Sequence, residues 1–253
     1  MNDIELIFER VQARQRARQR ESLAVIATLP CATCTLGSES ARGCQFFDRP
    51  GCKHVEELDR DRKRQQVERN RADNLRRAGM DSATVADPNV QLVVTGRLQP
   101  RKAIVAVRQA LETPQLRFLV LGGPHRSGKT LALFEACATR SSSTYIRAQQ
   151  LSRIDQPHDH WKATEILCIN ELGREHLGNG FASGNLDEIM AEREYGSRKL
   201  TIFATNLPLR AADTMQSLAS RYGDLFASRI AAPIGAYVLC ADAGPGNEAG
   251  APR

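Results

Sequence analysis

Residues 117–138 read RFLVLGGPHRSGKTLALFEACA and contain the segment Gly123-Pro124-His125-Arg126-Ser127-Gly128-Lys129-Thr130. This segment matches the pattern G-x-x-x-x-G-K-[ST] at every fixed position, with an apolar run before it and helix-forming residues after it. Glycines let backbone N–H groups turn inward around phosphate oxygens, and the N-terminus of the following helix adds positive potential. We therefore expect a strand, a phosphate-binding loop that uses all eight residues, and a helix.

The two residues that end the loop carry its chemistry. Lys129 is expected to reach the β- and γ-phosphates of ATP, and the Thr130 hydroxyl is expected to ligate Mg²⁺. His125 and Arg126 occupy variable positions of the pattern and are expected to face solvent rather than to take part in catalysis. The alternative is a glycine turn between a strand and a helix that binds no phosphate.

Short apolar runs recur about every 20 to 35 positions from residue 90 onwards. Such runs, separated by helix-forming segments, predict βαβ units and an α/β fold with a parallel sheet. The predicted strands are 117–123, 143–148, 165–170, 199–205 and 236–240. The predicted helices between them are 128–139, 184–196 and 211–222.

A second element follows the loop by about 40 residues, in the segment EILCINELG of residues 165–173. Its apolar run ends at Asn170 and Glu171, where P-loop ATPases carry an aspartate for the Mg²⁺ shell and a glutamate that orients the attacking water. An amide accepts a hydrogen bond but lacks the charge. We expect slow ATP hydrolysis with nucleotide binding kept; the alternative makes Glu171 a strand-end carboxylate without a role.

These motifs occur together with KLTIFATNLP at 199–208 and RYGDLFASRI at 221–230. With them the chain resembles the AAA+ ATPases of the DnaC/IstB type, which are bacterial helicase loaders and ATPase partners of certain transposases. The resemblance covers about residues 70–240 and implies a P-loop (AAA+) core with a parallel sheet. The order of the motifs is more specific to this group than the phosphate loop alone.

The resemblance also implies roles for two residues beside Glu171. Asn206 matches the sensor that contacts the γ-phosphate or the attacking water, and Arg229 matches the arginine finger that enters a neighbouring subunit's ATP site. Arg221 is the alternative finger, while a turn residue and a surface ion pair are the plainer interpretations of Asn206 and Arg229. No Lys or Arg lies between Arg229 and Arg253, so the C-terminal sensor arginine of many relatives has no obvious counterpart.

Four cysteines cluster with the spacing C-x2-C-x9-C-x7-C, at Cys31, Cys34, Cys44 and Cys52. Four thiolates satisfy tetrahedral Zn²⁺, and His54 is an alternative fourth ligand. The sequence therefore predicts a structural zinc site, and the alternative is a set of unrelated thiols in a loop-rich linker. Some helicase loaders carry a zinc-bearing N-terminal module that engages the helicase, so the placement agrees with the resemblance.

The composition is that of an ordinary soluble protein, with 42% hydrophobic and 25% charged residues and a net charge of +6. No apolar run approaches the roughly 20 residues that span a bilayer, so we expect a cytoplasmic protein without a membrane segment. The basic stretch of residues 10–20 is either a contact for nucleic-acid phosphates or a solvated helix.

We expect four parts: a helix and zinc module at 1–54, a charged connecting helix and linker at 55–88, the ATPase core at 89–242 and a disordered tail at 243–253. The resemblance implies a helicase loader that uses ATP as an assembly switch on single-stranded DNA and self-associates through neighbouring ATP sites. The alternatives are an IstB-like partner of a transposase and a nucleotide-dependent scaffold with weak hydrolysis. A small-molecule kinase is disfavoured, because KLTIFATNLP and YGDLFASRI have no place in it.

Overall fold

The computed structural model describes residues 53–154, 156–175, 181–195, 199–211 and 216–240. The chain divides into two compact units, Met1–Val67 and Glu68–Arg253. Of the first unit, the structure describes only the beginning of helix α2 (Lys53–Arg77), which continues into the second unit. No helix in the described ranges combines the length and the apolar character needed to cross a membrane.

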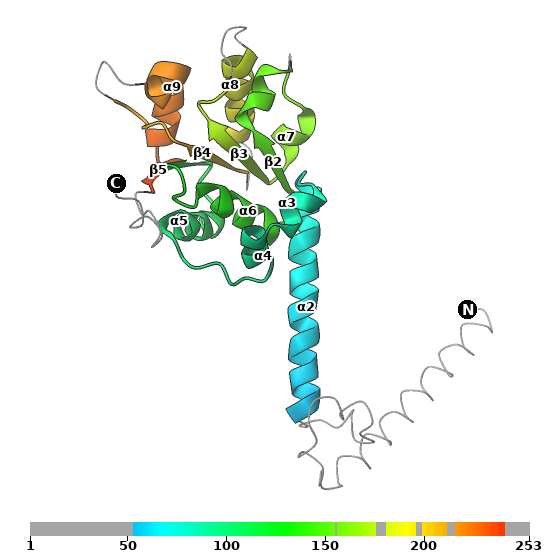
Figure 1. Ribbon diagram of the computed structural model, residues 1–253. Helices are drawn as coiled ribbons and strands as arrows, with labels where there is room; N and C mark the ends of the chain where they lie inside the picture. The colour runs from blue at the N-terminus through cyan, green and yellow to red at the C-terminus, as the bar shows by residue number, and fades with distance from the viewer. Residues whose placement is uncertain (1–52, 155, 176–180, 196–198, 212–215, 241–253) are drawn as a thin grey trace, which may run out of the picture. The chain divides into compact units, whose positions relative to one another are not determined.

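The second unit is built on a parallel sheet, which has five strands within the described residues (Figure 1). The strand order is β2-β3-β4-β1-β5, and every printed pairing is parallel. The predicted α/β fold is therefore confirmed. The strands are β1 (Phe118–Gly122), β2 (Ser143–Arg147), β3 (Ile166–Leu172), β4 (Leu200–Thr205) and β5 (Gly235–Leu239).

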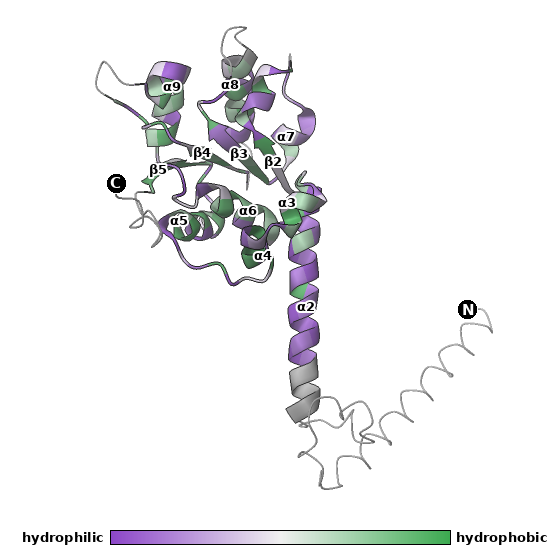
Figure 2. Ribbon diagram, viewed as in Figure 1, coloured by the Kyte–Doolittle hydropathy of each residue, from purple (hydrophilic) through white to green (hydrophobic). Residues whose placement is uncertain are grey.

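Helices cover both faces of the sheet, because alternate strand residues point to opposite sides. On β1, Leu119 and Leu121 pack into one apolar cluster, and Phe118 and Val120 pack into another. Figure 2 shows the central strand β4 as strongly apolar. Four helices pack against the first cluster: α3 (Ser82–Ala86), α4 (Pro88–Val94), α5 (Lys102–Leu111) and α6 (Lys129–Thr139). Four helices on the other face pack against the second cluster: η2 (Ala148–Ser152), α7 (Asp159–Ala163), α8 (Phe181–Glu194) and α9 (Leu218–Ala231).

The strand order decides which residues meet at the carboxyl edge of the sheet. Strand β4 lies between β1 and β3, with Phe203 in register with Val120 on one side and with Ile169 on the other. The segments that follow these three strands therefore lie side by side. An irregularity in the β3–β4 pairing between Ile169 and Leu172 alters the register where β3 ends.

Helix α9 differs from the predicted helix at 211–222, since it begins at Leu218 and ends at Ala231. Ser217 starts it, because its hydroxyl accepts a hydrogen bond from the Ser220 backbone N–H at 3.1 Å and thereby satisfies one free helix donor. Gly223 interrupts the helix with a φ of 87°, a conformation that only glycine adopts readily. The predicted helices at 128–139 and 184–196 correspond to α6 and α8.

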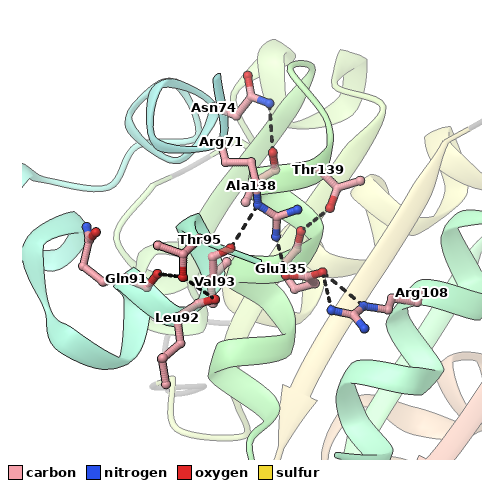
Figure 3. Close-up of polar contacts among 10 residues, drawn as sticks. All are labelled: Arg71, Asn74, Gln91, Leu92, Val93, Thr95, Arg108, Glu135, Ala138 and Thr139. Atoms are coloured by element: carbon pink, nitrogen blue, oxygen red, sulfur yellow. Dashed lines mark hydrogen bonds and ion pairs between the residues drawn. The ribbon is translucent and has the colours of Figure 1, made fainter. Parts of the chain in front are cut away.

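The end of α2 docks on α6 through a buried carboxylate, as Figure 3 shows. Glu135 of α6 is 4% exposed and pairs with Arg71 of α2 at 2.6 Å and with Arg108 of α5 at 2.9 Å. Asn74 also donates to the Ala138 carbonyl at 3.0 Å, and Leu75 is fully buried. Residues 71–75 of the predicted charged connecting helix therefore pack against the sheet unit.

Arg193 of α8 is fully buried without a carboxylate partner among the described residues. Its guanidinium makes six hydrogen bonds, to the Thr201 hydroxyl and to backbone carbonyls at the end of α7 and at the starts of β3 and β4. The carbonyls are those of Trp161, Lys162, Thr164, Glu165 and Leu200. Burial lowers the pKa of Arg193 to about 10, so the side chain stays charged at neutral pH.

Candidate nucleotide-binding site

The predicted phosphate loop connects β1 to α6, as the motif requires. Gly123 has a φ of 136°, and a Cβ at this position would lie 2.4 Å from the Cys240 carbonyl oxygen. Gly128 has a φ of 86° immediately before the helix. Both positions therefore require glycine, the first because backbone approaches backbone and both because the φ is positive.

Lys129 folds back over this loop. Its ammonium donates to the carbonyl oxygens of Gly123 at 2.8 Å and Pro124 at 2.6 Å and to the Ser127 hydroxyl at 3.1 Å. The side chain is nearly buried, and this burial lowers the pKa of Lys129. A desolvated cation that is held only by neutral oxygens is favourably placed to exchange them for phosphate oxygens.

Thr130 and Asn170 face each other across the start of α6 and the end of β3. The Thr130 hydroxyl donates to Asn170 Oδ1 at 3.3 Å, while Asn170 Nδ2 donates to the Tyr145 hydroxyl at 2.9 Å. Tyr145, on the neighbouring strand β2, thus fixes which end of the amide is directed at Thr130. The amide presents its oxygen to the predicted metal ligand, as the aspartate of P-loop ATPases would.

Glu171 and Asn206 lie at the same edge. Glu171 has a φ of 61°, which is uncommon outside glycine and concentrates at functional sites, and its carboxylate pairs with Arg174 at 3.2 Å. Asn206 follows β4, and its Nδ2 lies 3.0 Å from His125 Nε2. The contact shows that His125 is directed at the predicted sensor residue, which the sequence analysis did not anticipate.

One cavity of about 530 Å³ brings these groups together. Of the predicted residues, Gly123 and Pro124 do not line it; they contribute the carbonyls that bind Lys129. The predicted residues that line it are His125, Arg126, Ser127, Gly128, Lys129, Thr130, Asn170, Glu171 and Asn206.

Neither candidate arginine finger lines this cavity. Arg229 pairs with Glu194 at 3.0 Å and lies 3.8 Å from an Asp187 oxygen, both on α8. Arg221 pairs at 3.0 Å with the buried carboxylate of Glu175. A finger acts in another subunit's site, so its role stays a prediction; in the single chain Arg229 of α9 is paired with carboxylates of α8.

The donor set beside the loop fits Mg²⁺. A hydroxyl and an amide oxygen converge there, and Mg²⁺ keeps several waters and takes the remaining ligands from one or two protein oxygens and from phosphates.

For zinc the structure offers no test, because Cys31, Cys34, Cys44 and Cys52 lie outside the described residues and the side chain of His54 is not described. Among the described residues, no group of three or more His, Cys, Asp or Glu side chains is placed to hold a metal ion.

Two residues of the site escaped the sequence analysis. Tyr145 comes from β2, and Arg101 precedes α5; Arg101 lines the cavity, and its Nη1 donates to the Arg126 carbonyl at 3.2 Å. No motif includes either residue. Nothing in the sequence indicated Arg101, and the role of Tyr145 follows only from the pairing of β2 with β3 in the structure.

No family model and no curated protein matches the chain. Among solved structures the chain is similar to the replication initiator DnaA bound to AMPPCP and single-stranded DNA (18% identity, 53% of this chain and 44% of that chain, TM-score 0.41). It is also similar to the DnaC helicase loader (20% identity, 56% of this chain and 93% of that chain, TM-score 0.41). A third similar structure is DnaI (19% identity, 67% of this chain and 90% of that chain, TM-score 0.42). The chain spans less than half of the initiator structures it matches.

The parallel sheet, the phosphate loop and the cavity at its carboxyl edge define an α/β protein of the P-loop class.

Proposed function

We propose that this chain binds ATP with Mg²⁺ at the phosphate loop and uses the nucleotide as an assembly switch in loading a replicative DNA helicase onto single-stranded DNA. The observation that carries the nucleotide part is the convergence of Lys129, Thr130 and Asn170 on one cavity with Asn206. The loader part is supported by the motif resemblance, above all by the segments at 199–208 and 221–230.

Each residue has a specific task in this proposal. Lys129 exchanges the Gly123 and Pro124 carbonyls for phosphate oxygens, and the loop N–H groups with the start of α6 bind the remaining charge. Thr130 and Asn170 would hold Mg²⁺, which neutralises phosphate charge when bound. Asn206, supported by His125, is placed to report the terminal phosphate.

The same site is proposed to hydrolyse ATP slowly. Asn170 offers a neutral oxygen where a carboxylate would bind the metal more strongly, and the Glu171 carboxylate is paired with Arg174 rather than free to polarise water. A long-lived ATP state suits a protein whose nucleotide controls assembly. The same feature supports the alternative of a nucleotide-dependent scaffold.

Binding is tested by titrating the full-length protein with a fluorescent ATP analogue. The wild type is expected to bind, and Lys129→Ala is expected to lose at least about tenfold in affinity, because a buried charge–phosphate contact is removed. Lys102→Ala removes an exposed lysine that does not line the cavity and serves as the matched control. Equal binding by all three proteins, or none by the wild type, contradicts the nucleotide site.

The loader role is tested with the purified replicative helicase of the same host. We expect a complex by size exclusion that depends on ATP and is lost when residues 1–54 are deleted, because the proposed zinc module contacts the helicase. Stable association with a host transposase instead would favour the IstB-like alternative. ATP binding without either partner would leave the scaffold function.

A further inference from the structure

Arg101 is a cation of the cavity that lies outside every motif of the chain. It occupies the N-cap position of α5, but its side chain makes no capping hydrogen bond. The side chain instead extends to the phosphate loop, where Nη1 donates to the Arg126 carbonyl oxygen at 3.2 Å. The guanidinium is thus attached to the middle of the loop from a different part of the chain.

The stem of Arg101 also packs against the glycine that begins α6. A Cβ at Gly128 would lie 3.1 Å from Arg101 Cδ and 3.9 Å from Nη1. The side chain therefore lies beside the start of the helix, where free backbone N–H groups already attract an anion. Arg101 therefore adds a second positive group beside the start of α6.

Within the described residues, Arg101 has no carboxylate partner, whereas Arg174 at the same cavity is paired with Glu171. A guanidinium has five N–H donors and keeps its charge, and it matches phosphate oxygens in pairs. The printed contact with the Arg126 carbonyl uses one nitrogen. An arginine without a carboxylate partner beside a phosphate loop is suited to bind the oxygens of a phosphate chain.

We propose that Arg101 contacts the phosphates of the bound nucleotide and is a binding residue of the site; this inference rests on the proposed function. Its contacts are with Arg126 and Gly128 of the loop. The groups suited to sense the terminal phosphate, Glu171 and Asn206, follow β3 and β4. Arg101 therefore acts on the phosphates that ATP and ADP share, and it supplies a cationic contact within the same subunit.

The test measures the affinities of full-length wild type, Arg101→Gln, Arg101→Lys and Arg97→Gln for ATP and ADP by isothermal titration. Arg97 is exposed and does not line the cavity, so it controls for the loss of one positive charge nearby. For Arg101→Gln we expect an affinity about tenfold lower for both nucleotides, the usual order for one charge-assisted contact. Arg101→Lys should recover part of the loss, and Arg97→Gln should bind like the wild type.

The thermal midpoint of unfolding without nucleotide distinguishes a binding role of Arg101 from a structural one. Arg101→Gln should leave this midpoint within about 2 °C of the wild type. Unchanged affinity of Arg101→Gln while Lys129→Ala fails to bind would overturn this inference and leave the proposed function intact. A loss for ATP alone, or an equal loss in Arg97→Gln, would also overturn it. A wild type that binds neither nucleotide overturns the proposed function, and this inference with it.

Discussion

Asn170 is held in one orientation by its neighbours, and this makes it the best position for a gain of activity. In Asn170→Asp, one carboxylate oxygen replaces Oδ1 opposite Thr130, and the other accepts a hydrogen bond from the Tyr145 hydroxyl, which only has to rotate its proton. The added charge strengthens the metal contact. We expect ATP turnover to rise about tenfold or more, measured as phosphate release at saturating Mg²⁺ and ATP.

The control for this variant is Asn170→Asp combined with Tyr145→Phe, which removes the hydroxyl that orients the side chain. Part of the gain should be lost in the double variant. If Asn170→Asp hydrolyses ATP no faster than the wild type while binding it equally well, the neutral amide is not what limits hydrolysis.

His125 is expected to act through Asn206. Removing the imidazole in His125→Ala leaves the Asn206 amide without its 3.0 Å partner, so the amide is less well positioned toward the terminal phosphate. ATP turnover should fall severalfold, while ADP affinity changes by less than about twofold. A double-mutant cycle with Asn206→Ala checks the coupling, because residues in contact show non-additive effects. Strictly additive losses would contradict it.

At the level of single residues, the motif predicted the positions that the backbone itself determines. Lys129 and Thr130 follow from the loop, and the cavity contains both. Tyr145 and Arg101 reach the site from other elements, through side-chain contacts whose partners lie 25 residues away in each case. Such contacts depend on strand order and side-chain direction, and a local pattern contains neither.

Among the elements, α6 is fixed from outside by the Glu135 cluster of Arg71, Glu135 and Arg108. Arg71→Ala removes the 2.6 Å pair with a nearly buried carboxylate and the donor to the Val93 carbonyl at 3.0 Å. We expect the free energy of unfolding to fall by about 1–3 kcal/mol, since a buried charge loses one of its two partners. Urea denaturation measures the change.

Arg76 provides the matched control on the same helix. Its pair with Asp73 is half exposed on both sides, so Arg76→Ala should cost less than about 1 kcal/mol. Equal losses in the two variants would mean that the contribution of Arg71 comes from helix propensity or apolar contact rather than from Glu135.

The strands were predictable because buried parallel strands are continuous apolar runs, as in β1 and β4, whose residues are all buried. The end of α9 was not predictable in the same way. Its apolar periodicity is interrupted at Gly223, and a helix that tolerates a kink there extends beyond the glycine that would ordinarily end it. The burial of Leu75 also escaped prediction, because one apolar residue in a charged segment gives no periodic signal.

For the whole molecule, the lowered pKa of Lys129 links nucleotide binding to pH. Burial lowers this pKa in the free protein, and bound phosphates would raise it, so the complex retains a proton that the free protein releases at alkaline pH. Affinity for ATP should be highest below the free-state pKa and should fall as pH rises through it.

Titrations across the alkaline range measure this dependence, and Lys129→Arg is the control. A guanidinium stays charged throughout, so that variant should bind more weakly but lose this alkaline decline. A wild-type affinity that is the same at neutral and alkaline pH would show that nucleotide binding does not change the protonation of Lys129.

The buried guanidinium of Arg193 limits how this sequence can change over generations. Its six acceptors belong to two different elements, α7 and β4, and to the segment between α7 and β3. Lysine has three donors on one atom and cannot reach them all, so any single replacement leaves several carbonyls dehydrated and unpaired. Arg193 can therefore be replaced only together with changes in the surrounding backbone. Related sequences that keep this fold should retain arginine at this position.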